Sequence, residues 1–204
     1  MNASFGPSAA RAKRICVFCG SSPGSRPGFV ALARAFGEAL GRTGRGLVYG
    51  GAKVGLMGAV ADGALASGAE VIGVLPHFLA AKELAHERLT ELVLVETMHE
   101  RKAKMAELAD AFVALPGGFG TLEELFEVLT WAQLGLHRKP CAVLDYEGFF
   151  DGIAAFADRA LTDGFVRQAH RDLLIVATEP DALLDRIDRY EPPVIEKWVT
   201  RDRT

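Results

Sequence analysis

The chain has 204 residues, of which 24% are charged and 50% are hydrophobic, a balance typical of a globular protein with one core. Its formal net charge of -3 means that the chain has no excess of positive charge to neutralise the phosphates of a nucleic-acid backbone, so we expect no nucleic-acid partner. No run of about 18 apolar residues occurs, so we expect no membrane-spanning helix and no membrane partner.

Short hydrophobic runs alternate along the chain with segments of helical periodicity. Strands are predicted at 14–19, 46–49, 70–75, 92–96, 111–115, 140–144 and 174–177. Helices are predicted at 28–42, 56–66, 99–108, 121–134, 149–162 and 181–190. This alternation is typical of parallel βαβ units whose strands are covered by helices on both faces. We therefore expect one α/β domain over residues 1–204, with tails at 1–12 and 191–204. Its fold is predicted to be a Rossmann-like, doubly wound parallel sheet of about seven strands in three αβα layers.

The cysteines and the start of the chain indicate a reducing compartment. The first residues contain no apolar segment of the roughly 7 to 15 residues that a secretory signal requires. The chain has three cysteines, an odd number that argues against a disulfide framework. Cys16 and Cys19 form a CxxC pattern, but residues three apart on a strand point to opposite faces, so we expect buried thiols. A cytoplasmic protein is the prediction.

Three predicted strand-to-helix junctions, at 20–22, 50–58 and 116–121, are rich in glycine or serine. Ligands bind beyond the carboxyl ends of parallel strands, and a helix start offers free N–H groups and a positive dipole end. The junctions therefore predict a cradle for a phosphate or another anion, although glycine is also common at such turns for its backbone freedom alone. No GxGxxG pattern follows the first strand and no Gly-Lys pair occurs, so neither a dinucleotide fingerprint nor a Walker loop is present.

Glu124 lies one turn into the helix that follows the third junction, where its carboxylate can face the anion cradle. The apolar stripe of this helix is predicted to comprise Leu122, Leu125, Phe126 and Leu129. Glu124 falls on the opposite side, near Val128 and Trp131, so we expect a ligand or a second subunit to cover it and to raise its pKa. A solvated surface carboxylate is the alternative interpretation.

Arg101 shares a predicted helix face with Met105 and Leu108. A guanidinium on an apolar stripe needs an anionic partner, unless its stem runs along the core and its head reaches water. The other catalytic chemistries lack a motif, because the five histidines form no HExxH pattern and no GxSxG occurs. A metal site and a Ser-His-Asp hydrolase are therefore disfavoured.

Four segments of the chain, YGGAKVGLMG, MHERKAKM, ALPGGFGTLEEL and TWAQLGLHRKP, resemble the LOG ("lonely guy") family of cytokinin riboside 5'-monophosphate phosphoribohydrolases. The resemblance extends over about 15–165, and its most specific element is the PGGxGTxxE pattern at 116–124. Members of this family were often labelled lysine decarboxylases, but the chain has no evident lysine context for pyridoxal phosphate. We therefore expect no cofactor.

The resemblance implies hydrolysis of the N-glycosidic bond of a purine riboside 5'-monophosphate, which yields an adenine-type base and ribose 5-phosphate. It assigns catalysis to Arg101 and Glu124 and requires no metal. The substrate-contact positions that it implies are Ser21, Gly51, Glu83, Met98, Lys102, Gly117, Gly118, Gly120, Thr121, Glu123 and Thr130. A carboxylate near the anomeric carbon would stabilise the positive charge of the transition state. Arg101 would either stabilise the departing base or hold Glu124 and the ribose in place.

The resemblance also implies a homodimer with active sites near the subunit interface. Apolar residues on two sides of the helix at 121–134 independently favour self-association. One departure is that family loops often read GGG where this chain has Gly50, Gly51 and Ala52. Whether AMP or an N6-prenylated nucleotide is preferred stays open, and the segment 76–91 is the least family-like.

The alternative function is a protein of the same fold that binds a nucleotide or a molybdenum-cofactor-type pterin without turnover. A carrier has no need to keep Arg101 and Glu124 together. Their joint presence therefore favours the enzyme.

Overall fold

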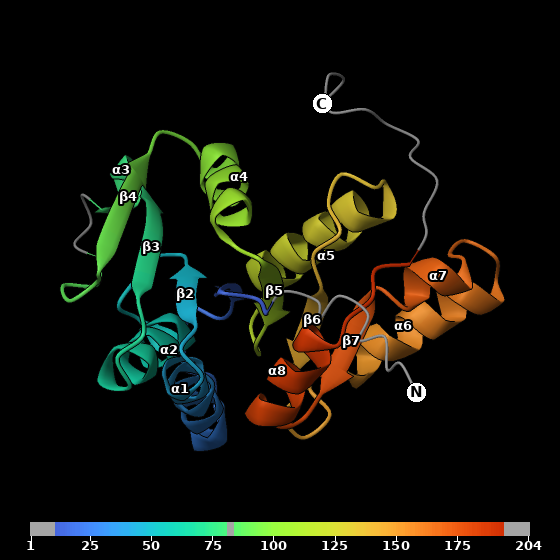
Figure 1. Cartoon of the computed structure of the whole chain (residues 1–204), viewed down its shortest axis with the longest axis horizontal. Coiled ribbons are helices and arrows are strands. Elements are labelled where there is room, and N and C mark those ends of the chain that lie inside the picture. Colours follow the sequence, from blue (N-terminus) through green and yellow to red (C-terminus); the bar gives the residue numbers. More distant parts are fainter. Residues whose placement is uncertain (1–10, 81–83, 194–204) are drawn as a thin grey trace, which may run out of the picture.

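Seven parallel strands form one sheet at the centre of the computed structural model, which describes residues 11–80 and 84–193. The strands are β1 (Arg14–Phe18), β2 (Gly46–Tyr49), β3 (Val71–Pro76), β4 (Glu91–Val95), β5 (Ala111–Ala114), β6 (Cys141–Leu144) and β7 (Leu174–Ala177). Their order across the sheet is β4-β3-β2-β1-β5-β6-β7 (Figure 1). The predicted doubly wound, seven-stranded fold is confirmed. Because the winding reverses at β1, the switch point where such folds bind ligands lies between β1 and β5.

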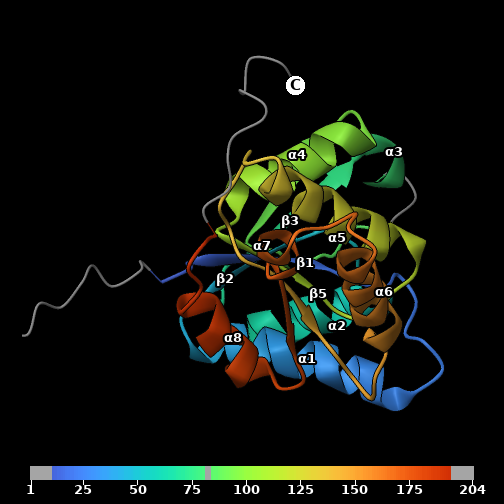
Figure 2. The same cartoon turned by 90° about the vertical axis from the view of Figure 1, so that its right-hand side faces the viewer.

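Helices cover both faces of this sheet, as Figure 2 shows. One face carries α1 (Pro27–Arg42), α2 (Gly55–Ala66) and α8 (Pro180–Asp188). The other carries α4 (Met98–Leu108), α5 (Phe119–Gln133) and α6 (Asp151–Thr162). Each face has its own core because strand side chains alternate: Ile15 and Val17 of β1 enter the first, and Phe18 enters the second.

All predicted helices and strands are present with ends within about two residues of those expected. Two short helices, α3 (His77–Ala80) and α7 (Gln168–Arg171), were not predicted, because four residues are too few to display a helical period. The predicted apolar stripe of α5 was wrong at Phe126, which is exposed, and it omitted Val128, which is buried. The buried face of α5, which packs against the sheet, comprises Thr121, Leu125, Val128 and Ala132. Two adjacent lines of this helix are apolar, and only the packing selects between them.

The three cysteines, Cys16, Cys19 and Cys141, are buried free thiols, as predicted. Cys16 and Cys19 enter opposite cores, which confirms that their spacing reflects strand geometry. The predicted tails lie mostly outside the described residues, but Ala12 packs into the first core and so belongs to the domain. Among residues 11–80 and 84–193, no helix combines the length and the hydropathy needed to cross a membrane.

Candidate active site

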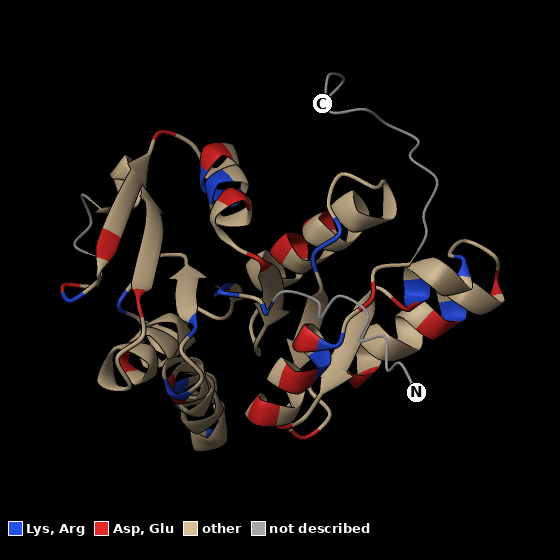
Figure 3. Cartoon of the chain, in the orientation of Figure 1, with Lys and Arg blue, Asp and Glu red and all other residues tan. Residues whose placement is uncertain are grey.

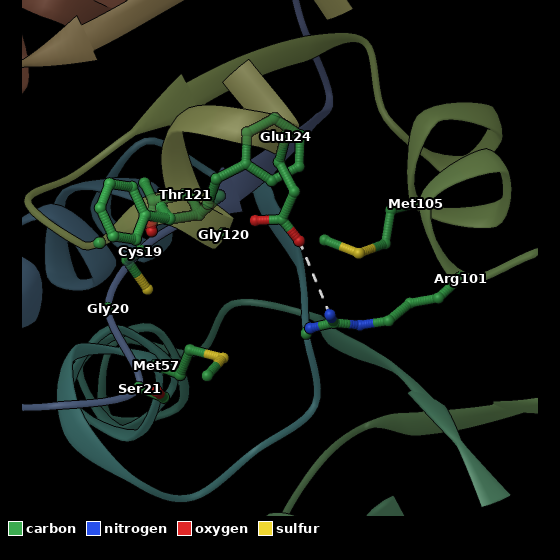
Figure 4. Close-up of a pocket in the computed structure, with 14 residues that line it drawn as sticks. Cys19, Gly20, Ser21, Met57, Arg101, Met105, Gly120, Thr121 and Glu124 are labelled. Atoms are coloured by element: carbon green, nitrogen blue, oxygen red, sulfur yellow. Dashed lines mark ion pairs between the residues drawn. The ribbon is translucent and has the colours of Figure 1, made fainter. Parts of the chain in front are cut away.

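A cavity of about 310 Å³ opens where β1, β2 and β5 end, at the switch point of the sheet. It lies near the lower end of the range for small-molecule sites, roughly 300–1,000 Å³. Its walls are formed by Val17, Phe18, Cys19, Gly20, Ser21, Gly50, Met57, Arg101, Met105, Gly118, Phe119, Gly120, Thr121 and Glu124. Figure 4 shows Arg101 and Glu124 pointing toward one another across this space, with the sulfur atoms of Met57 and Met105 beside them.

The predicted anion cradle forms one side of the cavity through close backbone approach. Gly20 donates its N–H to the Pro116 carbonyl at 3.0 Å, and a Cβ on Gly117 would lie only 2.8 Å from the nitrogen of Gly20. The helix α5 begins directly afterwards, with Gly118 as a cap residue that has no side chain to satisfy the first N–H groups. These groups and the positive end of the helix dipole favour an anion at this position, and its binding stays a prediction.

The predicted pairing of Arg101 with an anionic partner is confirmed. Arg101 Nη1 lies 3.6 Å from Glu124 Oε1, and the two side chains are only 10% and 13% exposed. Arg101 Nε also donates a hydrogen bond to the Val74 carbonyl of β3 at 3.1 Å. The guanidinium is therefore held between the sheet and α5, at the edge of the cradle.

Burial raises the pKa of Glu124 to about 7, in the direction predicted from the sequence. The charge of Arg101 lowers this pKa, and the neighbouring Glu123 raises it. A carboxyl group that titrates near neutral pH exchanges protons readily under physiological conditions, as general acid and base groups do. Glu124 can therefore take part in proton transfer or, once ionised, stabilise a cation.

Lys102 connects α4 to α5 next to this pair. Its Nζ donates hydrogen bonds to Glu123 at 2.6 Å and to Glu127 at 3.0 Å, and its side chain is 11% exposed. Burial lowers the pKa of Lys102, but the two carboxylate partners raise it above its ordinary value. In Figure 3, α5 carries only acidic charges, whereas both signs alternate along α4. Lys102 therefore compensates the acidic helix from the facing one.

Replacing Lys102 with methionine is expected to lower Tm by about 2–4 °C, equivalent to ~1 kcal/mol for partly exposed ion pairs in a chain of this size. The matched control is Lys104→Met, because Lys104 pairs with the exposed Glu107 on its own helix. That variant is expected to change Tm by less than about 1 °C. Differential scanning calorimetry checks both values, and equal shifts would contradict a special role for Lys102.

Comparison with known proteins decides the family. A family profile described as "Possible lysine decarboxylase" matches residues 57–187. The cytokinin riboside 5'-monophosphate phosphoribohydrolase LOG7 of Arabidopsis thaliana is 46% identical over 182 residues, covering 89% of this chain and 84% of LOG7. The corresponding enzyme LOG of Oryza sativa subsp. japonica is also 46% identical, covering 89% of this chain and 75% of LOG. The chain belongs to the LOG family.

Solved structures of other proteins share the fold of this LOG-family chain. The molybdenum cofactor binding protein from the phototrophic bacterium Rippkaea orientalis has a TM-score of 0.68 at 20% identity, covering 88% of this chain and 98% of that one. The molybdenum cofactor carrier protein from Chlamydomonas reinhardtii has a TM-score of 0.66 at 19% identity, with the same coverage of 88% and 98%. At these identities the likeness concerns the fold alone.

The structure places the substrate-contact positions suggested by LOG-family resemblance in different surroundings. Those that line the cavity are Ser21, Gly118, Gly120 and Thr121. Gly117 lines the adjoining hollow together with Gly20 and Ser21. Those that lie outside both are Gly51, Met98, Lys102, Glu123 and Thr130, and Glu83 lies outside the described residues. All of these substrate contacts stay predictions.

The positions outside the cavity have visible local interactions. The Gly51 carbonyl accepts a hydrogen bond from the His86 N–H at 2.9 Å. Lys102 and Glu123 pair with each other, and the Thr130 hydroxyl donates to the Phe126 carbonyl at 2.7 Å. Met98 is exposed at the start of α4.

Several residues of the cavity wall were not among the predicted catalytic and substrate-contact residues, including Gly50, Met57 and Met105, although Gly50 and Met57 belong to the predicted junction at 50–58. Met105 had a signal, because it lies one turn after Arg101 on the same helix face. For Met57 and Gly50, the sequence contains no signal beyond their position in a glycine-rich junction. Their approach to Arg101 depends on how α2 and α4 pack on opposite faces of the sheet.

Proposed function

We propose that this chain hydrolyses the N-glycosidic bond of adenine-type riboside 5'-monophosphates, giving the free base and ribose 5-phosphate. The observation that carries the proposal is the buried pair of Arg101 and Glu124, 3.6 Å apart and one helical turn from the glycine-rich start of α5. Two relatives at 46% identity that bear the name of this activity support it.

The 5'-phosphate is proposed to bind at the start of α5, where the N–H groups and the helix dipole favour an anion. The ribose then extends toward Glu124, which lies one turn further along the same helix. Positive charge develops at the anomeric carbon as the bond to the base breaks. The ionised carboxylate of Glu124 stabilises that charge and orients the attacking water.

The overall reaction consumes one water. The water oxygen forms the new bond to the anomeric carbon, and the electron pair of the broken carbon–nitrogen bond moves to the base. The base takes up one proton, and the sugar keeps a hydroxyl group. Arg101 holds the carboxylate of Glu124 in its orientation and lies on the same side of the cavity as Met105, beside the space for the departing base.

Chromatographic detection of the released base tests this proposal. AMP and isopentenyl-AMP are incubated with the protein, and adenine or isopentenyladenine is expected together with ribose 5-phosphate. The ratio of the two rates decides the substrate preference. Adenosine is the matched control, because it lacks the group that the cradle binds, and it is expected to react far more slowly. Nucleotide binding without base release would favour the carrier function.

We further propose that the chain forms a homodimer through the outer surfaces of α5 and α6. Phe126 of α5 and Phe156 of α6 lie with their ring centroids 6.4 Å apart, and Phe156 is 61% exposed. Phe119, at the mouth of the cavity, is 93% exposed. Exposed aromatic side chains of this kind are typical of contact surfaces, and a second copy would cover them next to the active site. A cytoplasmic location stays a prediction from the sequence.

Replacing Phe156 with glutamate is expected to convert the dimer to a monomer, because a charge would be buried without a partner at the interface. Analytical ultracentrifugation at micromolar concentration checks this, with the wild type expected at twice the 21.9 kDa of one chain. Phe78→Glu is the matched control, since Phe78 is a similarly exposed phenylalanine on α3, near the opposite edge of the sheet. A wild type that sediments at 21.9 kDa would refute the dimer.

A further inference from the structure

Gly50 follows β2 directly and lines the cavity, and its backbone does not explain why it is glycine. Its neighbour Gly51 has a φ of 77°, in the left-handed region that favours glycine. Gly50 lies outside that region, so an alanine could adopt its backbone conformation. The two neighbouring positions therefore require glycine for different physical reasons.

The space around Gly50 supplies the reason. A Cβ at this position would overlap with Nη2 of Arg101 and would lie 3.1 Å from both Cζ of Arg101 and the sulfur of Met57. These three atoms belong to the ends of flexible side chains. The glycines of the core differ, because a Cβ on Gly37 would meet the backbone of α2 and a Cβ on Gly73 would meet the backbone of Gly51.

The guanidinium of Arg101 is thus confined on three sides. Its Nε donates to the Val74 carbonyl at 3.1 Å, its Nη1 lies 3.6 Å from Glu124, and its Nη2 occupies the space left by the missing side chain of Gly50. The first two contacts are attractive and the third is steric. A side chain at position 50 would overlap Nη2, so the guanidinium would have to shift from the position in which it makes its other two contacts.

We propose that Gly50 is a positioning residue whose missing side chain forms the slot that seats the Arg101 guanidinium beside Glu124. The consequence for turnover rests on the proposed function, but the seating itself is a property of the folded chain. Displacing a catalytic group by about 1 Å can lower a rate by about 10²-fold.

The first test compares base release by the wild type, Gly50→Ala and the control Gly46→Ala, a glycine at the opposite end of β2 whose Cβ would lie 3.2 Å or more from its neighbours. Gly50→Ala is expected to lower kcat by about 10-fold to 10²-fold, with Tm within a few degrees of the wild type. Gly46→Ala is expected to keep full activity. Unchanged kcat in Gly50→Ala, or its failure to fold, would overturn the proposal, since the slot is bounded by side-chain ends that can yield.

The second test asks whether Gly50 acts through Arg101. The double variant Gly50→Ala/Arg101→Ala is expected to be no slower than Arg101→Ala alone, because the guanidinium that the slot seats is already absent. A further loss in the double variant would mean that the new methyl group obstructs the substrate directly, and the proposal would be wrong.

A third test needs no turnover and so separates this proposal from the proposed function. The carboxyl group of Glu124 can be titrated by ¹³C nuclear magnetic resonance, with Glu124→Gln to assign the signal. Both Gly50→Ala and Arg101→Ala are expected to raise its pKa, because the charge of Arg101 lowers it in the wild type. A shift in Arg101→Ala but none in Gly50→Ala would overturn the slot, even in a protein that releases no base.

Discussion

Replacing Glu124 with glutamine is expected to lower kcat for base release from AMP by at least about 10²-fold. The amide keeps the size of the side chain but carries no charge, so it cannot stabilise the cation that forms at the anomeric carbon. KM is expected to change much less, because the proposed phosphate contacts lie at the start of α5 and are left intact. Single-turnover kinetics with chromatographic detection of adenine separates the two effects.

The matched control is Glu107→Gln, an exposed carboxylate on α4 that pairs with Lys104. It is expected to keep full activity. A loss of similar size in both variants would show that the rate depends on the overall negative charge of the surface. The catalytic role assigned to Glu124 would then be wrong.

Stability measurements check that the glutamine variant remains folded. Burial raises the pKa of Glu124 from 4.5 to about 7, so ionising this group disfavours the folded state. The wild type therefore loses folding free energy as the pH rises through the window from about 4.5 to about 7, whereas the glutamine cannot ionise. The Tm of the variant relative to the wild type is expected to rise across that window and to stay constant above it.

The fold could be predicted almost completely from hydrophobic patterning. Strands such as β2 and β6 are continuous apolar runs, and each is followed by a helix, which leaves a parallel sheet as the consistent arrangement. The exposed side of α5 was the main exception. Phe126 and Val128 are both apolar, and only the packing of α5 on β5 and β1 decides that Val128 is buried.

The site was predictable where a residue conflicted with its own surroundings. Arg101 on an apolar stripe and Glu124 after a glycine turn were both identified in this way, and the structure brings them within 3.6 Å. The contacts of Gly50 and Lys102 were not predictable. They join segments that are distant in sequence, so their distances follow from the order of the strands and the tilt of the helices.

Replacing Arg101 with alanine is expected to lower kcat by about 10²-fold. Its diagnostic feature is the pH dependence. If the carboxylate of Glu124 is the active form, wild-type kcat/KM rises as the pH increases through about 7, the pKa to which burial raises this group in the free protein. Because the charge of Arg101 lowers that pKa, its removal is expected to move the acidic limb of the profile to higher pH.

The conservative variant Arg101→Lys tests what the guanidinium adds to its charge. Lysine keeps a positive charge but has neither the planar fork nor the Nε–H that donates to the Val74 carbonyl at 3.1 Å. We expect it to restore the position of the acidic limb more fully than it restores kcat, since the limb depends on charge and the rate also depends on placement. An acidic limb at the same pH in the wild type and in Arg101→Ala would show that the pair is not coupled during turnover. Arg101 would then act on the departing base alone.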